Sequence, residues 1–422
     1  MHKTKVIFSF AFASFISTLA LSGQNNTNSP YTRFGYGSIA DIASGEQRAM
    51  GGISLGTRSN RSISAANPAS YSAVDSLTFM FDLGTSALLS RFADGNLSKT
   101  TFNANIEYIT MQFRLFKGMG FSTGLLPYSF VGYNFSSSEQ NYLPSGTDPS
   151  VNDTITATKT FLGTGGLNQV YVGLSYNFFN YVSLGVNAYY LFGGINHDRY
   201  LTFSSADAAS GSAKDVLNVS DFRLRYGLQL HNTFGTKHQL TLGVIYENKS
   251  SLDGKFSTVK SGALSDEETF DDYKYDLPET FGAGLFYIYD EKLSLGADFS
   301  LQRWSKINFG NNSEPYNDRW KVAVGAEYQP DGKGRKILDR MKYRLGLNTS
   351  SSYYNINGKT PANGFGITFG IGLPLNKSMV FSGINAAVEY GKLGTNRLLS
   401  EDYFKLTFNI CFNETWFFKR KL

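Results

Sequence analysis

The chain has 422 residues, of which 41% are hydrophobic, 15% aromatic and 17% charged, and it contains 43 glycines. This composition is typical of a β-rich protein with many turns. A single cysteine, Cys411, excludes an intrachain disulfide and a CxxC site. The formal charge of +5 does not indicate nucleic-acid binding, because five of the 39 basic residues lie at the two ends of the chain and the other 34 balance the 34 acidic residues.

Residues 1–23 have the pattern of a secretory signal peptide. Lys3 and Lys5 form a basic start, an apolar run continues to Leu21, and Ser22 is a small residue suited to cleavage. A retained membrane anchor is the alternative, although the run is short and contains Ser and Thr. No later stretch approaches the ~20 apolar residues that a spanning helix needs. A membrane protein with this sequence is therefore expected to be a β-barrel.

Residues 24–75 do not alternate between apolar and polar positions, and they are rich in Gly, Ala, Ser and Asn. The segment contains Asn67-Pro68-Ala69. An asparagine side chain can cap free N–H groups, and proline at the first helical position loses no hydrogen bond. Taken alone, this tripeptide predicts only a helical turn.

From residue 76 onward the chain divides into about fourteen alternating segments. Their expected spans are 76–90, 101–116, 119–136, 155–178, 181–203, 220–234, 238–249, 278–289, 292–308, 316–329, 339–354, 363–373, 378–391 and 403–418. The connections alternate between short ones, such as 117–118, and long ones, such as 137–154 and 250–277. The exception is 330–338, a longer basic connection where a short turn is expected. Tight turns on one side and long loops on the other are typical of bacterial outer-membrane barrels.

The last strand shows the pattern most clearly. Successive side chains of a strand point to opposite faces, and one face of residues 403–418 is almost entirely apolar while the other is polar. The apolar face carries Phe404, Leu406, Phe408, Ile410, Phe412, Trp416 and Phe418. The sequence thus predicts an all-β fold, a transmembrane antiparallel β-barrel over residues 76–418 with a short basic tail at 419–422. A barrel of this width needs a plug in its lumen, and residues 24–75 are available.

Several arginines alternate with apolar residues in these strands and are expected to face the lumen, because a charge on the lipid face costs ~2–4 kcal/mol at the bilayer midplane. Arg223, Arg225 and Arg344 are the candidates for binding a ligand carboxylate. The alternative is that they pair with inward acids, for which the sequence offers Asp82, Glu247, Asp298 and Glu389. A row of glycines in 363–373 indicates either space in the lumen for a plug or ligand, or barrel curvature.

The third strand contains Pro127, three residues after Gly124. Proline cannot donate a hydrogen bond to a neighbouring strand, so the strand is expected to bulge or kink at this position. Gly124 and Pro127 are therefore candidates for a lateral opening in the wall; a harmless bulge near the rim is the alternative.

The chain resembles the FadL family of outer-membrane long-chain fatty acid transporters. The resemblance rests on the signal peptide, the glycine-rich segment with Asn67-Pro68-Ala69, and a hairpin from Leu277-Pro278-Glu279-Thr280-Phe281-Gly282 to Trp304-Ser305-Lys306. In that family the N-terminal segment is a plug inside the barrel, and a kink in the third strand opens the wall sideways. The resemblance implies both features here, and it implies that Asn67, Pro68 and Ala69 form the plug motif.

The function predicted on this basis is passive uptake of hydrophobic small molecules, above all long-chain fatty acids, in the bacterial outer membrane. The first alternative is an outer-membrane barrel that acts in type IX protein secretion as a cargo-shuttle or binding protein. The second is a barrel enzyme, for which His231 is the one inward histidine; no nucleophile signature accompanies it, and no HxH or HExxH motif is present. We therefore expect no enzyme activity, no cofactor and no metal. The expected partners are a hydrophobic ligand, outer-membrane lipid and lipopolysaccharide, and the barrel-assembly machinery, with no nucleic acid and a monomeric state.

Overall fold

The computed structural model describes residues 26–95, 97–144, 152–205, 208–262, 266–270, 273–310, 315–356, 358–374, 383–394 and 399–415. The predicted signal peptide and basic tail lie outside the described residues, as do Trp416 and Phe418 of the last strand. No helix among the described residues has the length and apolar character needed to cross a bilayer.

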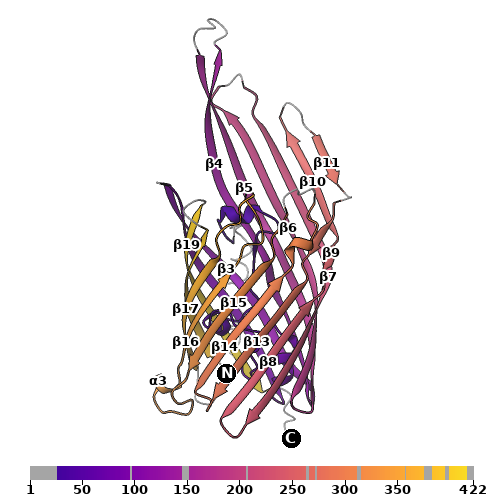
Figure 1. Ribbon diagram of the computed structural model, residues 1–422, viewed down its shortest axis with the longest axis vertical. Helices are drawn as coiled ribbons and strands as arrows, with labels where there is room; N and C mark the ends of the chain where they lie inside the picture. The colour runs from indigo at the N-terminus through magenta and orange to yellow at the C-terminus, as the bar shows by residue number, and fades with distance from the viewer. Residues whose placement is uncertain are drawn as a thin grey trace, which may run out of the picture.

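Fourteen antiparallel strands close into a barrel (Figure 1), as the sequence predicted. The strands are β2 (Thr78–Asp94), β3 (Leu97–Phe116), β4 (Met119–Pro144), β5 (Asn152–Phe178), β6 (Val182–Phe203), β7 (Gly211–Phe234), β8 (His238–Glu247), β13 (Thr280–Tyr289), β14 (Leu293–Gln302), β15 (Arg319–Tyr328), β16 (Lys342–Ser350), β17 (Gly364–Pro374), β18 (Gly383–Gly394) and β19 (Ser400–Thr415). Each strand pairs with the next in sequence among these fourteen, and β19 returns to pair with β2.

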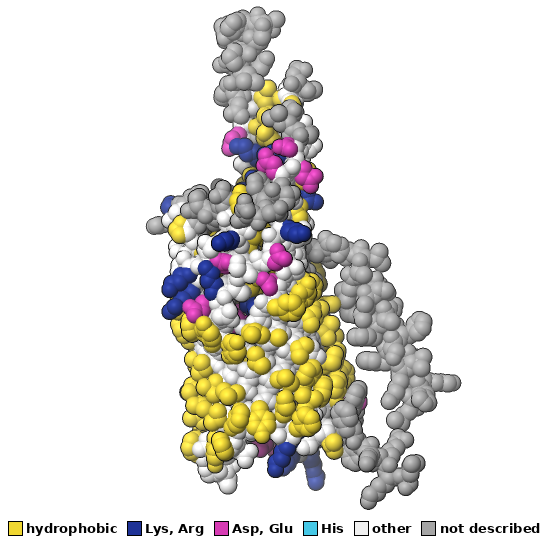
Figure 2. Space-filling model, turned by 90° about the vertical axis from the view of Figure 1, so that its right-hand side faces the viewer, with side chains coloured by type: hydrophobic (Ala, Val, Ile, Leu, Met, Phe, Trp, Pro, Cys, Tyr) yellow, Lys and Arg dark blue, Asp and Glu magenta, His cyan; other side chains and the backbone are white. Residues whose placement is uncertain are grey.

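Side chains alternate between the lumenal and the outer face of each strand, as expected. In β19, Thr407, Asn409 and Cys411 are buried, whereas Phe404 and Phe408 are 54% and 44% exposed on the outer face. Figure 2 shows the result as a broad band of hydrophobic side chains around the lower part of the wall, with charged side chains above it. An apolar belt of this kind is the surface that a barrel presents to hydrocarbon.

The chain turns tightly at the end of the barrel where β2 begins and β19 ends, which are paired at Thr78 and Thr415. Phe179 and Asn180 have φ of 52° and 61°, and Asp290 and Glu291 have φ of 53° and 54°. Positive φ at two successive residues is the geometry of the tightest hairpins. The short turns, together with the start of β2 and the end of β19, mark this end as periplasmic.

The opposite end is taller on one side than on the other. Strands β4 to β7 have 22 to 27 residues, whereas β8 and β13 to β17 have 9 to 11. The long strands rise above the rest of the barrel in Figure 1 and form an outer sheet together with β10 (Gly254–Ser261) and β11 (Asp266–Phe270).

The expected long loops 137–154 and 250–277, and the connection expected between residues 203 and 220, were partly wrong, because strands occupy much of each. Residues 212–219 of β7 pair with β10, and the short strands β9 (Ser250–Leu252) and β12 (Tyr275–Leu277) pair with each other. These segments lack the apolar face of a membrane strand. Outside the bilayer a strand does not need such a face, so the membrane pattern does not detect them.

The N-terminal segment lies inside the barrel (Figure 1) and contains η1 (Pro30–Arg33), β1 (Ser38–Ile39), α2 (Gly45–Arg48) and η2 (Pro68–Ala73). Asn67 caps η2 by accepting a hydrogen bond from the backbone N–H of Ala69, and Pro68 occupies the first turn. Ser44 and Gln47 form a reciprocal capping box at α2. Side chains of the segment thus cap α2 and η2 at their N-termini.

This segment is hydrogen-bonded to strands around the inner wall. The bonds run from Gly45 N to Tyr108 Oη, Gly51 N to Thr368 Oγ1, Ser54 N and Leu55 N to Asp298 Oδ2, Asn67 Nδ2 to the Leu228 carbonyl, and Tyr71 Oη to Asn187 Oδ1. The contacts are those expected of a plug. The domain limits 24–75 and 76–418 remain predictions.

Inward glycines let the segment's backbone approach the wall. A Cβ on Gly243 would lie 1.9 Å from the Leu55 carbonyl oxygen, and a Cβ on Gly346 would lie 2.0 Å from Gly51 N. The glycine row of β17 is different. Only Gly370 meets the segment there, with a Cβ position 2.5 Å from the Ala49 Cβ, while Gly364, Gly366 and Gly372 meet side chains of neighbouring strands.

We expect Gly243→Ala to loosen the N-terminal segment, because the added methyl group cannot share space with the Leu55 carbonyl. Trypsin should then cleave the segment faster at Arg48, Arg58 or Arg61 in detergent-solubilised protein, with the barrel still folded. The matched control is Gly211→Ala in β7, where the nearest atom, the Ser261 carbonyl oxygen, is 3.5 Å from the new Cβ. Equal cleavage rates in the two variants would contradict the close approach.

Candidate functional site

The wall of the barrel splits between β3 and β4. Their pairing starts at the periplasmic end with Phe116 and Met119 and stops at Ile109 and Leu125. Within residues 97–144, all of them described, no further residue pair joins the two strands. Above this point β3 pairs only with β2, and β4 pairs with β5. We call the region above Leu125 the β3–β4 gap.

Pro127 lies at the lower edge of the β3–β4 gap. The register between β4 and β5 shifts between Pro127 and Ser129, which is the bulge expected from a residue without an N–H. Gly124 lies just below, and a Cβ there would come 2.4 Å from the Ile109 carbonyl oxygen. Glycine at this position therefore allows the last residue pairs between β3 and β4 to form. Both residues lie where the wall divides; their role in a lateral opening remains a prediction.

Residues 26–40 of the N-terminal segment span the gap, and we call them the bridge segment. On one side β1 adds to the free edge of β4, pairing Ser38 with Phe130 and Ile39 with Ser129, and Ala40 N donates to the Tyr128 carbonyl at 2.9 Å. On the other side the bridge segment reaches β3. The contacts there are Asn105 Nδ2 to the Asn26 carbonyl at 2.8 Å and Asn28 Nδ2 to Asn103 Oδ1 at 2.9 Å.

A cavity of about 250 Å³ lies behind the bridge segment. Its lining is mixed, because apolar and aromatic side chains such as Ile39, Leu88, Tyr353 and Tyr354 share it with charged ones. The charged residues are Asp41, Arg48, Glu107, Arg319, Lys321, Glu389, Glu401 and Lys405. Asp41 Oδ2 is 2.6 Å from Lys321 Nζ, and Arg48 Nη2 is 2.9 Å from Glu107 Oε2. The cavity therefore offers both charged groups and apolar surface to an occupant.

Asp41 belongs to the N-terminal segment, and its cationic partners belong to β15. Its position inside the barrel would by itself raise the pKa of the carboxyl, but Lys321 and Arg319 outweigh this effect and hold the pKa of Asp41 well below its usual range. Asp41 is therefore ionised at neutral pH and neutralises part of the positive charge on β15.

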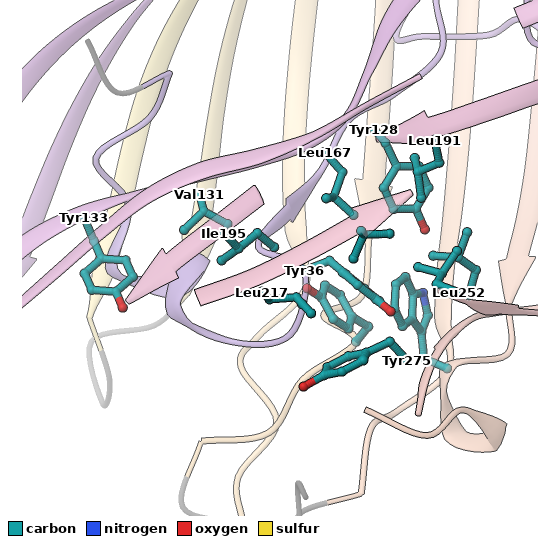
Figure 3. Packing of buried hydrophobic residues seen from close by; sticks show 14 residues of the cluster. Tyr36, Tyr128, Val131, Tyr133, Leu167, Leu191, Ile195, Leu217, Leu252 and Tyr275 are labelled. Atoms are coloured by element: carbon teal, nitrogen blue, oxygen red, sulfur yellow. The ribbon is translucent and has the colours of Figure 1, made fainter. Parts of the chain in front are cut away.

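Above the cavity, a cluster of aromatic and aliphatic side chains closes the outer part of the lumen. Tyr36 of the bridge segment is fully buried, and Figure 3 shows it among side chains from several strands. Trp304 stacks on Tyr353 with ring centroids 4.3 Å apart. The other members are Tyr128, Val131, Tyr133, Leu167, Leu191, Ile195, Leu217, Val219, Leu252, Tyr275 and Leu277. The lumen thus combines an apolar outer part with charged cavities below it.

The predicted lumenal arginines face inward and are paired with carboxylates. Arg223 Nη1 is 3.3 Å and Arg225 Nε 2.6 Å from Glu247, and all three side chains are buried. Arg223 also lies between the rings of Tyr128 and Tyr189, 5.0 and 5.1 Å from their centroids. A ligand carboxylate would have to displace Glu247 to bind both arginines. Their binding of a ligand carboxylate remains a prediction.

Arg344 lies apart from this pair, nearer the periplasmic end. Its Nε is 2.7 Å from Glu327 Oε2, and its Nη2 is 3.2 Å from Glu46 Oε2. Glu327 could be found from the alternation of its strand. Glu46 could not be identified from the sequence as a partner of Arg344, because it lies in a segment without periodicity.

The other acids that the sequence offered have different partners. Asp82 accepts from Tyr108 and Asn409, Asp298 from Ser54 N and Leu55 N, and Glu389 from Asn348 and Tyr403. Among the residues that the structure describes, no group of three His, Cys, Asp or Glu side chains is arranged to hold a metal ion.

We expect Glu247→Gln to destabilise the barrel by about 3–5 kcal/mol, because it leaves two buried guanidinium groups without their carboxylate. The free energy of unfolding in urea, measured in detergent micelles, tests this. Glu279→Gln is the control. The side chains of Arg303, its partner, and of Glu279 are 39% and 26% exposed. The free energy of unfolding should therefore fall by at most about 1 kcal/mol. Similar losses in both variants would mean that burial does not set the strength of these pairs.

Solved structures with a similar fold include toluene transporters and a homologue of FadL. The toluene transporter TbuX of Ralstonia pickettii matches with a TM-score of 0.56 at 14% identity, over 89% of this chain and 98% of that chain. The toluene transporter TodX of Pseudomonas putida matches with a TM-score of 0.55 at 16% identity, over 91% and 99%. A FadL homologue of Pseudomonas aeruginosa matches with a TM-score of 0.56 at 14% identity, over 90% and 99%.

These likenesses confirm the expected FadL-like fold, and with the apolar belt they confirm the outer-membrane barrel. At these identities they show the fold alone. No curated protein matches the sequence. The model of one protein family, described as BamG, matches residues 1–422. The chain therefore belongs to the BamG family.

Proposed function

We propose that this protein passes hydrophobic small molecules across the outer membrane, and that they leave sideways through the β3–β4 gap. The observation that supports this is the split in the wall at Leu125, which only the bridge segment spans among the described residues. Two of the fold neighbours are toluene transporters, and a third, CymD, is a monoaromatic hydrocarbon channel. Those activities are properties of the neighbours, and they agree with the proposal.

Within this class we propose long-chain fatty acids as the ligand. A fatty acid has an apolar chain and a carboxylate, and the lumen offers an apolar outer part and cationic side chains below it. Lys321 and Arg319 are balanced by Asp41 of the N-terminal segment, 2.6 and 3.9 Å away. A ligand carboxylate could take the place of Asp41. Because Asp41 follows the bridge segment directly, this exchange would favour release of the bridge segment and opening of the gap.

Locking the bridge segment to β4 should stop uptake. Ser38 and Phe130 are partners in the register of β1 and β4, so Ser38→Cys with Phe130→Cys, in a Cys411→Ser background, places two thiols within disulfide range. We expect oxidised cells to lose protein-dependent uptake of labelled oleate and a reductant to restore it. The control pair is Phe113→Cys with Phe121→Cys, where β3 and β4 are already joined.

The possible outcomes test the sideways route and the identity of the ligand separately. Oleate uptake that is the same with and without the protein, while the barrel is present in the outer membrane, would rule out fatty acid transport. Protein-dependent uptake that persists in the oxidised Ser38–Phe130 variant would rule out the sideways route and leave transport intact.

A second candidate is a binding role in an assembly of outer-membrane proteins. The outer sheet favours it, because strands of 22 to 27 residues extend well beyond the apolar belt. The barrel-assembly machinery is among the partners expected from the sequence. The type IX cargo-shuttle alternative belongs to the same class. A stoichiometric protein partner recovered with the tagged protein from cross-linked cells, together with protein-independent oleate uptake, would favour this candidate.

A further inference from the structure

The connection between β15 and β16 differs from the other described turns at the periplasmic end. The others are tight, as at Lys117–Gly118 and Asp290–Glu291. Residues 329–341 instead form an extended connection that includes the short helix α3 (Ile337–Arg340). This is the longer basic connection that stood out in the sequence, and neither the barrel nor the proposed transport route requires it.

The connection has a defined shape. Asp331 N donates to the Asp339 carbonyl at 2.8 Å, Gln329 Nε2 donates to the Arg340 carbonyl at 2.8 Å, and Met341 N donates to the Ile337 carbonyl at 3.0 Å. In this arrangement Ile337 and Leu338 are 51% and 60% exposed. Two adjacent aliphatic side chains are thus exposed on the surface of an ordered connection.

The helix lies on the lipid side of the barrel wall. Tyr343 neighbours the inward Arg344 in β16 and so faces outward, and its Oη donates to the Leu338 carbonyl at 3.3 Å. Tyr328, its partner across β15 and β16, is 50% exposed. Outward aromatic residues at strand ends mark the level where acyl chains meet headgroups. Figure 1 shows α3 at this end, at the edge of the barrel.

The same connection is cationic. Residues 329–341 contain four basic and two acidic side chains, and Lys333, Arg335 and Lys336 are all exposed. No carboxylate among the described residues forms an ion pair with these three cations. By contrast, Lys237 and Lys292 of the neighbouring tight turns both lie near Asp290, at 3.7 and 3.5 Å.

We propose that residues 336–338 anchor the barrel to the periplasmic leaflet by binding anionic phospholipid. Ile337 and Leu338 insert at the top of the acyl chains, and Lys336 binds the headgroup phosphate. Lys333 and Arg335 line a cavity with lumenal residues such as Arg344 and Asn409, so they are not part of the anchor. Exposed aliphatic residues beside an adjacent cation at a bilayer interface are the features of such an anchor. The position beside Tyr343 favours lipid over an acidic periplasmic protein as the occupant. The proposal is independent of the transport proposal.

A tryptophan at the helix tests the contact directly. Full-length Leu338→Trp protein is reconstituted into phosphatidylethanolamine vesicles that contain, at one mole fraction, either brominated phosphatidylglycerol or brominated phosphatidylethanolamine. The signal of the protein without the substitution is subtracted, because three native tryptophans contribute. We expect the added fluorescence to be quenched by bromine, and more strongly by the brominated phosphatidylglycerol.

Charge variants test the headgroup preference. Adding Lys336→Gln should lower the apparent preference for phosphatidylglycerol about fivefold, which corresponds to one cation near a charged surface. Lys237→Gln with Lys292→Gln is the control and should leave the preference unchanged. Ile337→Trp repeats the measurement if Leu338→Trp does not fold. Added tryptophans that are quenched by aqueous acrylamide and not by bromine would overturn the anchor, and equal quenching by both headgroups would overturn the anionic preference.

Discussion

The need to pair every backbone N–H and C=O group inside a bilayer determines most of this structure. Water is absent from the hydrocarbon core, so a sheet there must close on itself. The closing seam is β19 against β2, which pairs sixteen residues of each strand without a break. The β3–β4 gap is the one place in the described wall where adjacent barrel strands part over a long stretch. There β1 pairs with the free edge of β4, so part of the requirement is met from inside the barrel.

Closure with fourteen strands creates a second constraint, because the lumen is too wide for wall side chains alone to fill. The N-terminal segment occupies part of it and is held there by two kinds of contact. Glycines such as Gly243 and Gly346 let its backbone contact the backbone of the wall, and inward polar groups such as Asp298 and Thr368 accept hydrogen bonds from its N–H groups. The lumenal cations are balanced in the same way, from the wall by Glu247 and Glu327 and from the segment by Asp41 and Glu46.

The sequence predicted the barrel because alternation in a membrane strand is imposed by the solvent on each face. The apolar positions of β19 and the bulge at Pro127 follow from local chemistry, and both are present. Contacts across the lumen do not follow from local chemistry. The pair of Arg344 with Glu46 and the addition of β1 to β4 join residues far apart in the sequence, in a segment without periodicity. Strand β10 was missed for a different reason, since it lies beyond the bilayer and lacks an apolar face.

The bridge segment and Asp41 connect the wall to the charge balance of the lumen. Residues 26–40 contact both β3 and β4, and the next residue neutralises Lys321 and Arg319 on the opposite side of the cavity. Moving the bridge segment away from the gap would draw Asp41 from these cations and leave them unbalanced, which is costly in a partly dry interior. In the proposed route, electrostatics would therefore act together with backbone pairing to hold the bridge segment across the β3–β4 gap. An anion that replaces Asp41 removes the electrostatic part of this barrier, so a carboxylate-bearing ligand fits the proposed sideways route better than a neutral hydrocarbon does.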